Sequence, residues 1–237
     1  MDGVLLLPTQ DADQSWQKVC QQFASTLDLS SQLLEEALQE SRRAYRQDIE
    51  HDTQKQRRDR LKPFETRAEV VERGLEHLGR GGRAIAAEMV RAYEALHEKR
   101  QLTFSALDTL QQFRDHALPL ALISNGNATY QRKKIAQHHL ASFFDIILIE
   151  EEFGAGKPDQ RIFLAALDQL HIAAQDAWMI GDDLVFDIAA SQQLGIFAIW
   201  CDLAKRGLPH GSTIVPDRII HSLLDLFALL EDASFSA

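Results

Sequence analysis

Three aspartates stand close together after an apolar run. Asp182 and Asp183 follow Gly181 directly, and Asp187 comes four residues after Asp183. Carboxylates crowded at the end of a buried strand repel one another, and a bound divalent cation would relieve that repulsion. Magnesium commonly takes one or two protein carboxylates together with phosphate oxygens, so the cluster predicts a magnesium site. The alternative, acids that only favour a helix N-terminus, explains Asp183 well and Asp187 less well.

Two further segments carry groups that suit a phosphoryl group. Ser124-Asn125-Gly126 offers a hydroxyl and backbone N–H groups after another apolar run, which is how strand-to-helix turns hold phosphate. Lys157 lies on a loop between glycine and proline, where its charge could offset that of a phosphoryl group. Each segment alone is equally compatible with an ordinary surface turn.

All three segments lie close behind predicted strands. Short apolar runs predict the strands Leu118–Ile123, Phe144–Leu148, Ala177–Ile180 and Ile196–Trp200. Amphipathic stretches predict the helices Ser105–His116, Tyr130–His138, Gln160–Gln169, Val185–Leu194 and His221–Leu230. This alternation is typical of an α/β fold with a parallel sheet covered on both faces. Ligands of such sheets bind beyond the carboxyl ends of the strands, so we expect Ser124, Lys157 and Asp182 around one pocket.

The chain before about residue 100 follows a helical pattern instead. Apolar residues recur at helical spacing, as at Val19, Phe23 and Leu27, which predicts a bundle of about four helices. We therefore expect an α/β core of residues 1–13 and 99–237 and a helical module of residues 14–98 inserted into it. The module would cover the pocket and close over it to exclude water, with hinges near residues 13 and 100.

Taken in order, the polar segments resemble three motifs of the haloacid dehalogenase-like (HAD) hydrolase superfamily, specifically its phosphatase branch with a helical cap. The second family motif, an apolar strand ending in Ser or Thr, is similar to Leu120–Gly126. The third, a lysine followed by Pro-Asp and then Ile-Phe, is similar to Gly156–Phe163, and the fourth to Ile180–Ile188. The resemblance implies a Rossmann-like parallel sheet core with an inserted helical cap. Residues 14–98 have the length and place of that cap but share no motif with it.

The resemblance also implies a mechanism. A carboxylate attacks phosphorus, and water then hydrolyses the aspartyl-phosphate. Asp2 would be the residue that protonates the leaving alcohol and then activates water. Ser124 and the backbone N–H of Asn125 would hold the phosphoryl oxygens, and Lys157 would neutralise the charge of nucleophile and phosphate. The implied catalytic residues are thus Asp2 and Lys157, and the implied substrate-binding residues are Ser124, Asn125 and Lys157.

The implied cofactor is Mg²⁺. By resemblance, Asp182 binds the metal, the backbone carbonyl of Asp2 faces it, and Asp187 supports either the metal or Lys157. A dianionic phosphate will not approach a carboxylate cluster unaided, which is the chemical reason for the metal. The implied substrate is a small phosphorylated metabolite, and sugar phosphates, phosphoglycolate and nucleoside monophosphates all fit.

The first family motif matches only in part. It is an apolar strand ending in Asp-x-Asp-Gly-Thr or Asp-x-Asp-Gly-Val, and the sequence begins Met1-Asp2-Gly3-Val4. We therefore expect the nucleophilic aspartate and its strand upstream of Met1, in an extension of roughly 5–10 residues. Asp11 and Asp13 are weaker candidates for the nucleophile. Alternatively, Val4–Leu7 could fill the place of the absent strand and give a folded protein without catalysis.

Three functions remain open at this point. The first is a magnesium-dependent phosphatase. The second is a dehalogenase, which belongs to the same superfamily and uses no magnesium, so the aspartate cluster argues against it. The third is a non-catalytic phosphate-binding or interaction protein.

Composition excludes other classes. The chain has 237 residues, 45% hydrophobic and 25% charged, which is ordinary for a globular protein. Its net charge of −10 argues against a nucleic-acid partner. Cys20 and Cys201 are too few for a disulfide framework, and we expect both to be inert core residues. The first apolar run, Val4–Leu7, is too short for a signal peptide or a membrane span, so we expect a cytoplasmic protein without a membrane partner.

Overall fold

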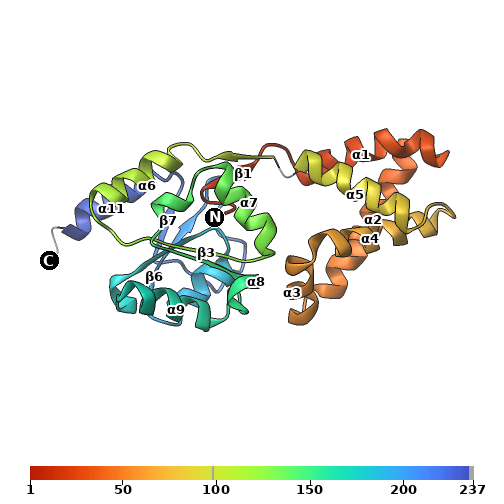
Figure 1. Cartoon of the computed structure of the whole chain (residues 1–237). Helices are drawn as coiled ribbons and strands as arrows, with labels where there is room; N and C mark the ends of the chain where they lie inside the picture. The colour runs from red at the N-terminus through yellow and green to blue at the C-terminus, as the bar shows by residue number, and fades with distance from the viewer. Residues whose placement is uncertain (98, 235–237) are drawn as a thin grey trace. The chain divides into compact units, whose positions relative to one another are not determined.

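The structure, a computed structural model, describes residues 1–97 and 99–234 and divides into two compact units. An α/β unit contains residues 1–7 and the chain from Leu102 onward, and a helical unit contains Pro8–Gln101 (Figure 1). Residue 98, where the predicted helical module ends, lies outside the described residues. In the described part of the chain, no helix has the length and apolar character needed to cross a membrane.

The helical unit contains five helices in its described residues. They are α1 (Ala12–Leu27), α2 (Ser31–Ile49), α3 (Thr53–Leu61), α4 (Pro63–His77) and α5 (Arg83–His97). The predicted apolar stripe of Val19, Phe23 and Leu27 is buried in the core of this unit. The unit thus has one helix more than the expected four. Helix α3 could not be predicted from apolar spacing, because none of its residues is buried.

The α/β unit contains parallel strands, as predicted. Strand β3 (Ala121–Ser124) pairs with β4 (Ile146–Ile149). Strand β5 (Trp178–Gly181) pairs with β6 (Phe197–Cys201), which pairs with the unpredicted β7 (Arg218–Ile220). The two groups of strands are not hydrogen-bonded to each other in the described part of the chain.

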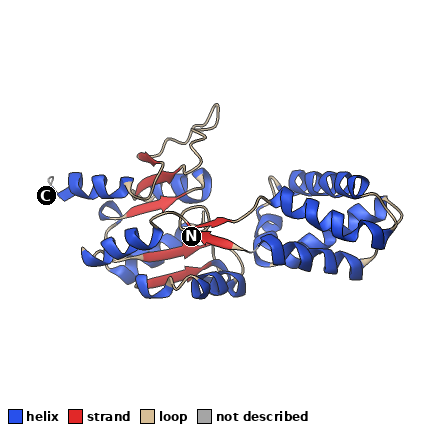
Figure 2. Ribbon diagram, turned by 90° about the horizontal axis from the view of Figure 1, so that it is seen from above, coloured by secondary structure: helices blue, strands red, loops and turns tan. Residues whose placement is uncertain are grey.

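Helices cover both faces of these strands (Figures 1 and 2). Helices α6 (Ala106–Asp115), α7 (Ala128–Gln137) and α11 (Asp225–Ser234) contribute to one apolar cluster, together with Leu122 of β3. Helices α9 (Gln160–Leu170) and α10 (Ala190–Gln192) pack in another cluster with the next residue of β3, Ile123. Because neighbouring strand residues point to opposite faces, this division confirms a sheet buried on both sides.

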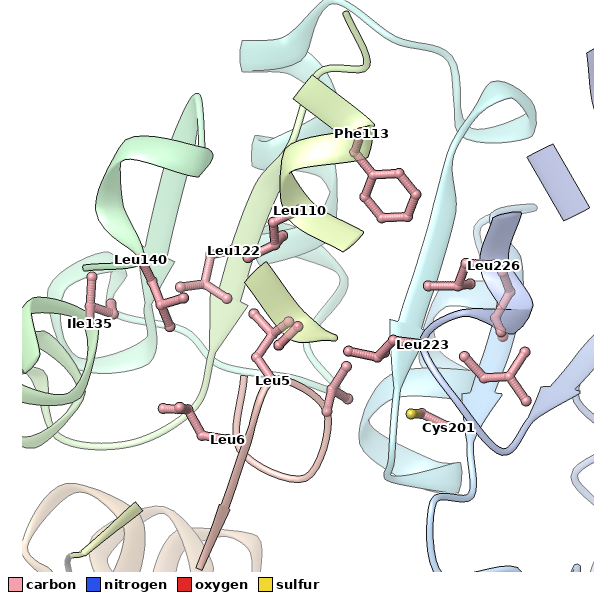
Figure 3. Packing of buried hydrophobic residues seen from close by; sticks show 14 of the residues in the cluster. Leu5, Leu6, Leu110, Phe113, Leu122, Ile135, Leu140, Cys201, Leu223 and Leu226 are labelled. Carbon is pink, nitrogen blue, oxygen red and sulfur yellow. The ribbon is translucent and has the colours of Figure 1, made fainter. Parts of the chain in front are cut away.

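The chain start forms a turn. The N–H groups of Leu5 and Leu6 donate to the carbonyl oxygen of Met1 at 2.9 and 3.1 Å. Both leucines are buried beside Leu110 and Leu122 (Figure 3). The chain continues as β1 (Leu6–Pro8), which pairs with β2 (Arg100–Leu102) where the two units are joined. The alternative in which Val4–Leu7 becomes the central strand is therefore wrong, because this segment folds back on Met1 instead.

A largely apolar cavity of about 520 Å³ is lined by both β3 and β5. Its lining includes Leu122 and Ile180 from these strands. Met1, Lys157 and Asp187 also line it. The strands that line it belong to the two groups that are not paired with each other. The apolar lining of the cavity would therefore suit the side chains of a further strand between β3 and β5.

Both cysteines are buried and free, as expected. Burial is the main cause that raises the pKa of each thiol to about 12, so both remain protonated and unreactive at neutral pH.

Candidate active site

The aspartate cluster is shaped by a π-helix, η3 (Leu184–Ala189), which begins three residues after the end of β5. The side chain of Asp183 caps this helix, since its Oδ1 accepts from the N–H groups of Val185 and Phe186 at 2.8 and 2.7 Å. The helix returns Asp187 to the end of β5, where a Cβ on Gly181 would lie 2.2 Å from the Cβ of Asp187. Only glycine fits at position 181, because any side chain there would displace Asp187.

Lys157 reaches the same place from the loop between α8 (Glu150–Phe153) and α9. Its Nζ forms an ion pair with Oδ1 of Asp187, and both side chains are almost completely buried. The second carboxylate oxygen of Asp187 accepts from the N–H of Asp183 at 3.1 Å. Asp187 is therefore engaged on both oxygens, and its contact with Lys157 corresponds to one of the two roles predicted for it.

Asn125 holds the backbone of Lys157 in a two-sided clamp. Its Oδ1 accepts from the N–H of Lys157, and its Nδ2 donates to the carbonyl oxygen of Lys157, both at 2.7 Å. The sequence suggested only a backbone role for Asn125. A clamp between residues 32 positions apart leaves no signal in one sequence, because nothing in the chain specifies which loop an asparagine side chain will reach.

The segment at the chain start packs against Asp182. Gly3 has φ of +75°, and a Cβ on it would lie 2.0 Å from Oδ2 of Asp182. The indole N–H of Trp200 donates to the backbone carbonyl of Asp182 at 2.9 Å. Glycine at position 3 is thus required both by its backbone conformation and by the closeness of the carboxylate.

Groups of like charge lie close together at this buried site. Burial, followed by the charge of Asp187, raises the pKa of the Asp182 carboxyl group, while the amino group of Met1 and Lys157 oppose this shift. Burial also lowers the pKa of the Met1 amino group, with Lys157 acting in the same direction. The structure therefore brings Lys157, Asp182, Asp187 and the backbone of Met1 within electrostatic reach of one another.

Ser124 lies buried at the end of β3, immediately before Asn125. The loop that follows is held by Glu150, since the N–H of Gly126 donates to Oε2 of this buried side chain at 2.9 Å. The side chain of Gln131 also donates to the carbonyl oxygen of Asn125 at 2.7 Å. These contacts fix the loop that was predicted to hold phosphoryl oxygens.

Asp2 contacts a lysine on helix α7. Its Oδ2 accepts from Nζ of Lys134, on α7, at 2.8 Å. The Asp2 side chain is 37% exposed, so it faces partly toward solvent. Lys134 is a residue of the site that the sequence did not indicate.

The donors present fit magnesium. Among the described residues, no group of three or more His, Cys, Asp or Glu side chains could hold a metal ion by itself. Magnesium does not need one, because it commonly takes one or two carboxylates and completes its shell with water and phosphate oxygens. Lysines engage the carboxylates of Asp2 and Asp187. Asp182 is a buried carboxylate that Asp187 repels. A bound cation would therefore stabilise the charged form of Asp182 more than that of the two lysine-paired carboxylates.

Replacing Asn125 with alanine should destabilise the α/β unit by about 2–4 kcal/mol. The change removes two hydrogen bonds and leaves the N–H and C=O groups of Lys157 to find other partners. Asn127→Ala is a matched control, because it removes the capping contact with the N–H of Tyr130 and an exposed contact with Glu151, together worth about 1 kcal/mol. Urea unfolding measures both, and an Asn125→Ala loss no larger than that of Asn127→Ala would contradict the clamp.

The chain is similar to proteins of known family. A family model described as haloacid dehalogenase-like hydrolase matches residues 1–195. Phosphoserine phosphatase of Thermus thermophilus is 34% identical over 165 residues, covering 70% of this chain and 64% of that protein. Pyrimidine 5'-nucleotidase YjjG of Escherichia coli is 31% identical over 126 residues, covering 53% of this chain and 55% of that protein. The matched regions thus span less than two thirds of the length of these curated relatives.

A solved structure is also similar over nearly the whole chain. The 2-haloacid dehalogenase of Pseudomonas syringae pv. Tomato superimposes with a TM-score of 0.65 and 25% identity, covering 98% of this chain and 96% of that one. The aligned region includes both the α/β unit and the helical unit, so each unit has a counterpart in that protein.

Proposed function

Because the chain belongs to the haloacid dehalogenase-like hydrolases, we propose that it is a phosphatase that hydrolyses a small phosphorylated metabolite through an aspartyl-phosphate. The observation that carries the proposal is the convergence of Lys157, Asp182 and Asp187 at the end of β5, against the segment Met1–Gly3. Phosphatases among the relatives, such as the phosphoserine phosphatase, support this choice of reaction.

In the proposed reaction an aspartate oxygen forms a bond to phosphorus as the bond from phosphorus to the leaving oxygen breaks. Asp2 donates a proton to the leaving oxygen and then takes one from the water that hydrolyses the aspartyl-phosphate. Ser124 and the N–H of Asn125 bind phosphoryl oxygens. Lys157, held by Asn125 and Asp187, offsets the negative charge that develops there.

An aspartate joined directly before Met1 would suit the role of the nucleophile. The backbone of Met1 lies buried beside Lys157 and Asp182, so a carboxylate one residue earlier would come close to the same groups. Asp11 and Asp13 do not suit this role, since Asp11 caps α1 through the N–H of Asp13 at 2.6 Å and Asp13 pairs with Arg42. Both belong to the helical unit.

Asp182 would hold Mg²⁺, with the backbone carbonyl of Asp2 as a further donor. When bound, the metal offsets the negative charge of the phosphate and of the carboxylates that meet it. The helical unit, residues Pro8–Gln101, is proposed to select the substrate and to exclude water from the reacting phosphate. It would thereby serve as the cap of the enzyme.

Metal removal tests the reaction class. The protein, as given and with the N-terminal extension described in the Discussion, is assayed for phosphate release from a panel of phosphate monoesters and for chloride release from 2-chloropropionate. We expect the rate of phosphate release to fall at least about 100-fold in EDTA and to return with excess MgCl₂. Without the metal, the negative charge of Asp182 would repel the phosphate of the substrate.

The other outcomes identify the alternatives. Chloride release that is insensitive to EDTA would replace the phosphatase with a dehalogenase, the activity named for the structural neighbour from Pseudomonas syringae. Absence of both activities in the extended protein, combined with measurable binding of inorganic phosphate, would favour a non-catalytic phosphate-binding protein.

A further inference from the structure

An ion pair joins the chain start to helix α7. Nζ of Lys134 lies 2.8 Å from Oδ2 of Asp2, although the two residues are 132 positions apart. The lysine side chain is only 15% exposed, against 37% for the aspartate. Such a pair is less screened by water than a fully exposed one, so it can restrict the orientation of the carboxylate more strongly.

Lys134 is carried by a rigid part of the site. Helix α7 begins directly after the loop of Ser124–Gly126, and its N-terminus is capped by Asn127. The preceding loop is fixed in turn by Glu150 and Gln131. Lys134 therefore has a defined position relative to the loop assigned to phosphoryl binding.

Asp2, in contrast, belongs to a short turn. The residues from Met1 to Leu6 are held by backbone hydrogen bonds, among them those to the carbonyl oxygens of Met1 and Leu6, and by burial of Leu5 and Leu6. Neither interaction orients the Asp2 side chain, which has single-bond rotations of its own. The contact with Lys134 links that side chain to the fixed part of the site.

We propose that Lys134 is a positioning residue for Asp2, which holds the carboxylate where it can exchange a proton with the leaving-group oxygen. The proposal rests on the proposed phosphatase function. Proton transfer requires hydrogen-bond reach, and misplacement of about 1 Å can cost roughly 100-fold in rate. The competing interpretation is a purely structural ion pair that ties the chain start to α7.

The dependence of rate on the leaving group separates these interpretations. p-Nitrophenolate is a stable anion at neutral pH and leaves without protonation, whereas the alkoxide of glycerol phosphate needs a proton. The measured quantity is kcat/KM, which covers the steps up to phosphoryl transfer to the enzyme. A positioning role for Lys134 should therefore affect the alkyl ester far more than the aryl ester.

The variants are made in the full two-unit chain, in the form that is active in the assay above. Lys134→Met should lower kcat/KM about 10–100-fold with glycerol phosphate and less than about 3-fold with p-nitrophenyl phosphate. Lys134→Arg should recover most of the loss, since it keeps the charge. Asp2→Asn should show the same substrate selectivity with a larger loss. Lys133→Met, a control on the exposed face of α7, should change neither rate.

Two results would overturn the assignment, and a third would overturn the proposed function on which it rests. An equal loss of kcat/KM on both esters would show that the pair only supports the fold. In that case Lys134→Met should also have a lower Tm than the unsubstituted protein. No loss on either ester would show that Asp2 is positioned without Lys134. If the unsubstituted protein hydrolyses neither ester, the proposed function itself fails, and that result is distinct from both others.

Discussion

Joining an apolar strand that ends in aspartate to Met1 should both stabilise the protein and give it phosphatase activity. Strands β3 and β5 have four residues each, and both line the apolar cavity without pairing with each other. A strand of four apolar residues between them would bury its side chains and satisfy backbone groups on both neighbours. The following aspartate would arrive beside the Met1 position, near Lys157 and Asp182.

The expected effects are large. Four buried apolar side chains contribute about 1.5–3 kcal/mol each, and ordering each residue costs roughly 1–2 kcal/mol. The midpoints of these ranges leave a net gain of about 3 kcal/mol, which corresponds to a rise in Tm of roughly 6–12 °C for a chain of this size. Because the extension supplies the nucleophile, phosphate release should rise at least about 1000-fold over the chain as given.

Two matched extensions separate packing from chemistry. An apolar strand ending in asparagine should raise Tm equally but give no activity, since the amide is not a nucleophile. A polar strand of serine, threonine and asparagine ending in aspartate should give neither effect, because it cannot fill the apolar cavity. If the chain as given hydrolyses phosphate esters as fast as the extended protein, the nucleophile lies within the present sequence and the assignment before Met1 is wrong.

Replacing Asp182 with asparagine should abolish most turnover while leaving the protein as stable as before or more stable. The carboxylate is buried next to Asp187, which raises its pKa, so its charged form costs folding free energy in the absence of metal. We expect at least about a 100-fold loss of phosphatase activity in the active form and weaker binding of Mg²⁺. Isothermal titration with MgCl₂ measures the binding directly.

The stability effect has a definite pH dependence. A carboxyl group whose folded pKa is raised destabilises the fold at every pH above that value, and the cost disappears as the pH falls toward its ordinary pKa. In EDTA, the free energy of unfolding of Asp182→Asn should therefore exceed that of the parent most at neutral pH. The difference should shrink on acidification. A difference that grows in acid would mean that the carboxylate is stabilising.

Asp183→Asn is the matched control for this variant. The Asp183 side chain caps η3 through the N–H groups of Val185 and Phe186, and asparagine caps helices about as well as aspartate. We expect Asp183→Asn to retain most activity and magnesium affinity. Equal losses in the two variants would show that the adjacent carboxylates act together, and the assignment of the metal to Asp182 would then fail.

The sequence alone predicted strands β3 to β6 and the places where they end. Strands β3 to β6 are near-continuously apolar, a signal that depends only on local composition, and the polar segments after β3 and β5 could be recognised from residue type. Strands β1, β2 and β7 have three residues each, too few to show a period. Helix α3 was missed because its residues are polar throughout and form no buried face.

The partners of the polar residues were decided by the tertiary structure. Asp182 and Lys157 could be named from the sequence, but the clamp of Asn125 on Lys157 and the contact of Lys134 with Asp2 could not. Each joins segments far apart in the chain, and such a contact depends on how helices and strands pack rather than on any local pattern. Apolar period and turn composition are local properties that a sequence displays directly. The orientation of a side chain toward a distant loop arises only when the core has closed.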